Sequence, residues 1–170
     1  EKSGGGKGLN GNDPGGGAKV KFLADAMVGR LARWLRVLGY DTYYRSSYPG
    51  NMLDRLMRED RYLLSRKRET VERYGAASLV HGNRVGEQIT RLRRELPLTP
   101  DPGAWFTRCL VCNNLLRTAG ADAAHENVPD YVFHVYPAAI RYCPSCGRYY
   151  WQGSHRERMI RQLKAWGFLS

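Results

Sequence analysis

The pattern of apolar and polar positions changes between residues 20 and 38 from that of a strand to that of a helix. Residues 20–24 alternate and then become continuously apolar, as in a buried strand. The apolar positions that follow recur at helical spacing and are Val28, Leu31, Leu35 and Leu38. Asp25 stands where the strand passes into the helix. Open α/β sheets carry their chemistry at such a carboxyl end, although an Asp in this position also serves as a helix cap.

The strand-like and helix-like patterns of apolar residues alternate along the chain as far as residue 97. Strand-like runs occupy residues 40–44, 62–64 and 77–80, and helix-like segments occupy residues 53–57, 68–74 and 85–96. Alternation of strands with helices is typical of parallel βαβ units. The sequence therefore predicts an α/β domain with a central parallel sheet flanked by helices. Asp41 falls at the opposite end of this sheet from Asp25, and we interpret it as a turn residue.

Composition divides the chain into parts. Residues 1–18 are rich in Gly, cannot bury apolar surface and are predicted to be a flexible tail. Residues 19–97 hold the α/β domain, and the prolines within residues 98–104 predict a stiff linker. Residues 105–170 are expected to form a small second domain that ends in a helix.

All four cysteines of the chain lie in the second domain, in two Cys-x-x-Cys pairs. They are Cys109, Cys112, Cys143 and Cys146. Two such pairs complete a tetrahedral set of thiolates, so we predict a zinc ribbon in which Zn²⁺ is structural, because a closed site has no open position for a substrate. The alternative is a pair of disulfides. Between the pairs, residues 131–136 have the composition of a strand.

The charge of the chain favours a polyanionic partner. Lys plus Arg number 27 against 16 Asp plus Glu, a formal net charge of +11, and RNA is the leading candidate. Arg30, Arg33 and Arg36 fall on one arc of the first helix, away from the leucines, and are expected to face outward. The alternative is that the arginines form a solvated face and that the net charge serves solubility. No apolar run approaches the roughly 20 residues needed to span a bilayer, so membrane insertion is not expected.

Aromatic residues and arginines alternate after the last cysteine, a composition that suits base stacking and phosphate contact. Alternatively, Tyr149 and Trp151 pack the ribbon on the first domain. Ser154 and Glu157 form a capping-box pair, which predicts a helix that ends at Gly167. The candidate RNA-binding residues are Arg30, Arg33, Arg36, Arg66, Lys67, Arg148, Tyr150, Trp151, His155, Arg156 and Arg158.

Three stretches of the chain resemble a known family. They are Phe22–Thr42, Cys109–Asn113 and Cys143–His155. Over residues 19–159 the chain resembles the Mut-seven C-terminal RNase domain, which implies a PIN-like nuclease fold followed by a zinc ribbon. The resemblance also implies carboxylates at the carboxyl ends of the parallel strands that hold Mg²⁺ or Mn²⁺, ions that activate water and neutralise the phosphate.

This chain departs from the family pattern at the acids. Asp25 matches the first acid, but Ser65-Arg66-Lys67 places an ammonium group where the family has a carboxylate. Gly50 and Asn51 stand where an acid is expected before the second helix, and Asn83 stands near the end of the fourth strand. We therefore expect impaired catalysis, with Lys67 paired to Asp25 where the metal would lie.

Three functions remain open at this point. The first is a structural RNA-binding subunit of a large ribonucleoprotein such as an organellar ribosome, in contact with ribosomal RNA and neighbouring proteins. The second is an active Mg²⁺- or Mn²⁺-dependent endoribonuclease, and the third is a protein-interaction module. Because the chain begins with Glu1, we expect a fragment or a processed product, which favours a mitochondrion or plastid as its location.

Overall fold

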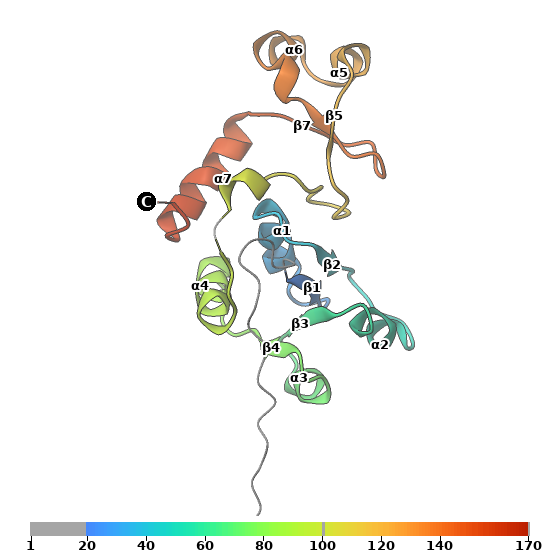
Figure 1. Ribbon diagram of the computed structural model, residues 1–170, viewed down its shortest axis with the longest axis vertical. Helices are drawn as coiled ribbons and strands as arrows, with labels where there is room; N and C mark the ends of the chain where they lie inside the picture. The colour runs from blue at the N-terminus through green and yellow to red at the C-terminus, as the bar shows by residue number, and fades with distance from the viewer. Residues whose placement is uncertain (1–19, 100, 170) are drawn as a thin grey trace, which may run out of the picture.

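A parallel sheet of four strands forms the centre of the first domain, in the order β2-β1-β3-β4 (Figure 1). The structure is a computed structural model that describes residues 20–99 and 101–169, so the predicted tail lies outside the described residues. The strands are β1 (Lys21–Ala24), β2 (Thr42–Tyr44), β3 (Arg61–Ser65) and β4 (Ala77–Leu79). The predicted α/β fold with a central parallel sheet is confirmed.

Helices connect the strands and cover both faces of the sheet. They are α1 (Gly29–Val37), α2 (Met52–Met57), α3 (Arg68–Arg73) and α4 (Val85–Glu95). Because successive strand residues point to opposite faces, Phe22 and Leu64 pack with α1 and α4, whereas Leu23 and Leu63 pack with α2. Burial on both faces explains why β1 and β3 consist of apolar runs rather than of strict alternation.

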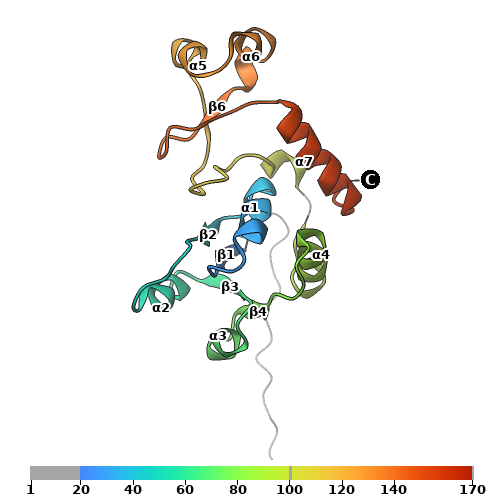
Figure 2. The same ribbon diagram turned by 180° about the vertical axis from the view of Figure 1, so that it is seen from behind.

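The second domain is a small antiparallel sheet with a helical insertion. Its strands pair in the order β5 (Arg117–Thr118), β6 (Arg141–Tyr142), β7 (Tyr149–Tyr150), and α5 (Ala121–Asn127) and α6 (Asp130–Val135) lie between β5 and β6. Short 3₁₀ turns, η1 (Pro102–Ala104) and η2 (Pro137–Ala139), precede the first cysteine and β6 respectively. In both views this domain stands at the end of the molecule away from α3 (Figure 2).

The prediction of a strand over residues 131–136 is wrong, because residues 131–135 lie in α6 and Tyr136 is its C-cap residue. Pro129 is the N-cap residue of the helix, and Asp130 stands in the first turn, where a carboxylate is favourable. Val132 is fully buried against α5 and Ile140, and this packing overrides the preference of the β-branched and aromatic residues for a strand.

The last helix, α7 (Ser154–Ala165), carries its buried side chains into the core of the first domain. Met159 and Leu163 are buried there, and the ring centroids of Trp34 and Trp166 lie 4.6 Å apart. Gly167 ends the helix with a φ of +74°, as predicted. The capping box is not formed: Gly153 is the N-cap residue and Ser154 is already helical, so its hydroxyl is one position too late to cap.

No helix in the described part of the chain is both long enough and apolar enough to span a membrane.

Candidate metal centre and nucleic-acid interface

The two Cys-x-x-Cys pairs form turns of the same construction. In the first, the N–H of Asn113 donates to the carbonyl of Cys109 at 2.9 Å, and in the second the N–H of Gly147 donates to the carbonyl of Cys143 at 2.9 Å. Both closing residues have positive φ, 73° for Asn113 and 72° for Gly147, a conformation that Asn and Gly tolerate best. The repeated backbone geometry brings the two thiols of each pair to one side of its turn.

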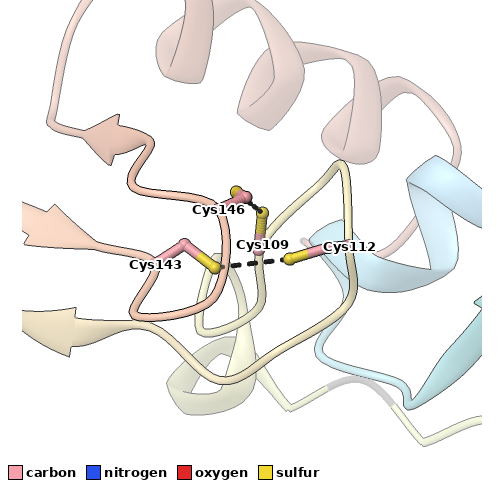
Figure 3. Close-up of side chains that lie close together, drawn as sticks. All are labelled: Cys109, Cys112, Cys143 and Cys146. Atoms are coloured by element: carbon pink, nitrogen blue, oxygen red, sulfur yellow. Dashed lines mark hydrogen bonds between the residues drawn. The ribbon is translucent and has the colours of Figure 1, made fainter.

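The four sulfur atoms converge on one point between the turns (Figure 3). All lie within 4.8 Å of one another, with 3.6 Å from Cys109 to Cys146 and 3.3 Å from Cys112 to Cys143. A disulfide needs about 2.05 Å, and the cysteines are free, so the two-disulfide alternative is not what the structure contains. A tetrahedral site with Zn–S bonds of about 2.3 Å places sulfurs about 3.8 Å apart. The cluster could therefore bind a metal ion such as zinc.

The surroundings of the sulfurs favour a thiolate at one corner of this cluster. Burial alone would raise the pKa of Cys112, but hydrogen bonds from Asn114 outweigh it and lower that pKa to about 6. Burial raises the pKa of Cys143 to about 12. The hydroxyl of Tyr150 lies 3.1 Å from the sulfur of Cys109, and burial and this sulfur together raise the pKa of the phenol. Tyr150, predicted as an RNA contact, is therefore already engaged at the cysteine cluster.

The prediction that three arginines of α1 face outward is wrong for Arg36. Arg30 and Arg33 are exposed, but Arg36 is only 3% exposed. Its Nε donates to the carbonyl of Thr42 at 2.9 Å, and its Nη1 donates to the carbonyls of Leu110 and Val111 at 3.0 and 2.9 Å. Burial lowers the pKa of this guanidinium, and the nearby Cys109 and Cys112 offset part of that lowering. Arg36 attaches the first cysteine turn to the α/β domain and is unavailable to RNA.

Asp25 lies where the strand-to-helix pattern placed it, at the carboxyl end of β1. Only 8% of it is exposed, and its Oδ1 accepts the N–H of Met27 at 2.8 Å. Its Oδ2 accepts a short hydrogen bond from the hydroxyl of Ser65 and a longer one, at 3.4 Å, from the N–H of Arg66. The carboxylate thus stabilises both the turn into α1 and the end of β3.

The predicted ion pair between Lys67 and Asp25 is not formed. The exposed Lys67 approaches Asp25 only through its backbone N–H, which donates to the hydroxyl of Ser65 at 3.0 Å. Arg66 turns instead to the side-chain oxygen of Asn83, at 3.1 Å. Among the described residues, three or more His, Cys, Asp or Glu side chains come within metal-binding reach of one another only at the cysteine cluster.

The remaining RNA-binding candidates separate into two regions. Arg66 and Lys67 lie exposed near Asp25, whereas Tyr150, Trp151, His155 and Arg156 line one open cleft of about 1100 Å³ beside the ribbon. Arg148 and Arg158 are exposed near this second region but do not line the cleft. Trp151 and Tyr149 pack on the helical insertion of the ribbon, not on the first domain as the alternative interpretation held.

The cleft has further lining residues that were missed from the sequence, and four of them carry charge or a phenol ring. They are Arg108, Tyr131, Tyr136 and Arg141. Tyr131 and Tyr136 were missed because residues 131–136 were interpreted as a strand. In a strand these two side chains would point to opposite faces. Arg108 and Arg141 each stand within two residues of a cysteine. That position indicated that they belong to the ribbon but gave no sign that they line a cleft.

The fold and these sites define a four-stranded parallel α/β domain joined to a small ribbon whose cysteine cluster could bind a metal ion. The family model for the Mut7-C RNAse domain matches residues 20–163, which span both parts. The chain belongs to the Mut7-C RNAse domain family, as its resemblance indicated. Searches of curated proteins and of solved structures found no match.

Proposed function

We propose that this chain is an RNA-binding member of the Mut7-C family with impaired nuclease activity, and that it serves as a structural subunit of a large ribonucleoprotein such as an organellar ribosome. In this proposal the cysteine cluster holds a structural Zn²⁺, and ribosomal RNA and neighbouring proteins are the partners. Family membership supports an RNA-related role, and the net charge of +11 supports a polyanionic partner.

The observation that carries the proposal is the environment of Asp25. Its two carboxylate oxygens are occupied by hydrogen bonds from Met27, Ser65 and Arg66. Mg²⁺ requires near-octahedral oxygen coordination, usually with more than one carboxylate or phosphate ligand. Asp54, in the neighbouring helix α2, does not supply the second one, because it is bound to Arg73 and Tyr74.

The positive groups at this edge oppose a divalent cation and favour phosphate. Arg66 and Lys67 are exposed there, and two unit charges about 4 Å apart interact by about 1 to 4 kcal/mol at effective dielectric constants between 80 and 20. The same charges that weaken a metal site attract the backbone of RNA. The edge of the sheet is thereby suited to hold RNA without cutting it.

The test combines binding, cleavage and sedimentation of the full chain. We expect a fluorescently labelled RNA of 20 nucleotides to bind with a steep salt dependence, and to remain intact during incubation with MgCl₂ or MnCl₂. Robust metal-dependent cleavage that Asp25→Asn abolishes would establish the endoribonuclease instead. Stable co-sedimentation with ribosomal RNA at moderate salt is expected for the subunit, whereas association with a protein partner that salt does not weaken would favour the interaction module.

A further inference from the structure

The cleft beside the ribbon is formed by parts of the chain that are distant in sequence. The segment from Gly103 to Leu110 lines it together with α6, η2, β7 and the first turn of α7. Its volume of about 1100 Å³ exceeds the range of about 300 to 1,000 Å³ that is usual for small-molecule pockets. An open cleft of this size has room for a short segment of a chain molecule.

Aromatic side chains line the cleft. Tyr131 and Val135 follow each other at i and i+4 on α6, and they are 67% and 60% exposed. Tyr136 and Trp151 line the same space and are half-buried. Such exposure of large apolar side chains beside a concave surface marks a binding site more often than a plain surface.

Arginines line the cleft as well, and the protein already holds each of them in place. The guanidinium of Arg156 lies over the ring of Phe106 at 4.6 Å from its centroid. Arg141 donates to the hydroxyl of Thr118 at 2.7 Å, and Arg108 donates to the carbonyls of Gly39 and Asn113. Cations held in this way lose little conformational entropy when a ligand binds.

The balance of charge identifies the kind of ligand. Among the described residues that line the cleft, Glu157 is the single acidic one, whereas three are arginines, namely Arg108, Arg141 and Arg156. An apolar peptide would bring no anion to these cations, and a paired duplex offers no free base faces to the tyrosines. Phosphates for the arginines and unstacked bases for the rings are both present in single-stranded RNA.

We infer that the cleft between the ribbon and α7 binds a single-stranded segment of RNA, with bases stacked on Tyr131 and Tyr136 and phosphates held by Arg141 and Arg156. This inference rests on the proposed function, since it places RNA on a specific surface of the same protein. It adds a second RNA-binding surface, on the ribbon and its helical insertion, to the edge of the sheet near Asp25.

The test measures fluorescence anisotropy with the full metal-loaded chain, a labelled decamer of adenylates, and a fully paired RNA duplex of equal length. Tyr131→Ala is expected to weaken decamer binding at least fivefold, the low end of base–aromatic stacking, while Tyr131→Phe retains binding. Arg141→Ala is expected to lower the slope of log K against log salt by about 0.7, the value for one phosphate contact in a single strand. The matched controls are Leu115→Ala and Arg117→Ala, at exposed positions of the ribbon that do not line the cleft.

The outcomes separate this inference from the proposed function. If the unaltered chain binds neither RNA, the proposed function fails. If it binds RNA but the cleft variants behave like their controls, the inference fails while the proposed function stands. Equal affinity for the duplex overturns the assignment to single strands, and displacement of the decamer by an acidic peptide of equal charge overturns the assignment to RNA.

Discussion

The side-chain amide of Asn113 is bound to Asp41, so that the residue closing the first cysteine turn contacts the start of β2. Its Nδ2 donates to Oδ1 of Asp41 at 2.9 Å, and its Oδ1 accepts the N–H of Thr42 at 2.9 Å. With the bonds from Arg36 to Leu110 and Val111, this contact joins the cysteine cluster to the α/β domain. The stability of the sheet is thereby linked to the metal site.

Removal of the metal is expected to destabilise the whole chain rather than the ribbon alone. In the proposed zinc site the ion would organise the first cysteine turn, on which the bonds from Arg36 and Asn113 depend. Chelation should lower the melting temperature by at least about 5 °C, corresponding to about 2 kcal/mol in a chain of this size. Hydrogen exchange measures where the loss occurs, and exchange that rises only in residues 105–151 would contradict the link.

Arg36→Met is expected to lower the free energy of unfolding by at least about 3 kcal/mol, because three carbonyls lose their donor at a cost of about 1 to 3 kcal/mol each. Arg33→Met, on the same helix but exposed, should change it by no more than about 0.5 kcal/mol. Urea denaturation of both variants measures the difference. A loss of similar size in the two variants would show that the carbonyl contacts of Arg36 are not what matters.

The contribution of Asp41 to stability is expected to depend on pH. Burial alone would raise its pKa, but hydrogen bonds from Arg61 and Asn113 lower the pKa below its ordinary value of 3.8. A lowered pKa in the folded state adds stability above pH 3.8 that is lost as the pH falls through the folded value. The gap in unfolding free energy between the parent and Asp41→Asn should therefore be largest near neutral pH and narrow below about pH 4.

Denaturation with urea between pH 3 and pH 7 measures this gap. Asp122→Asn, which removes one carboxylate at an exposed position of α5, is the control for the loss of a charge. All three proteins are measured with a chelator present, so that release of a bound ion at acid pH does not enter the comparison. A gap that widens toward low pH would contradict the assigned direction of the shift.

Lys67→Asp is expected to create Mn²⁺ binding at the edge of the sheet. The backbone of residue 67 already reaches Asp25 through Ser65, so a carboxylate there comes within range of the same ion. Affinity should rise at least about tenfold, or about 1.4 kcal/mol, within the range of close charge pairs. Titration calorimetry measures it, and Asp25→Asn in the variant should remove the gain.

Arg68→Asp is the matched control for that experiment. It makes the same change of charge one residue later, at the exposed start of α3. An equal gain in both variants would show that bulk charge, and not proximity to Asp25, governs metal binding.

The amino-acid sequence alone determined the elements whose signals are local. Apolar periodicity predicted β1 and α1, and the placement of Asp25 followed from the change of period between them. The spacing of Cys109, Cys112, Cys143 and Cys146 predicted the cluster that the sulfurs form. Such features depend on a few neighbouring residues and on covalent geometry, so they can be recognised without a partner segment.

Tertiary structure decided everything that depends on contacts between distant segments. Arg36 has the helical phase of an exposed residue, yet three carbonyls brought to it by β2 and the first cysteine turn bury its charge. Residues 131–136 have the composition of a strand, yet packing of Val132 on α5 makes them a helix. The cleft beside the ribbon exists because α6, β7 and α7 meet there. Packing free energy exceeds local preference at such positions, and no pattern along the chain encodes which segments will meet.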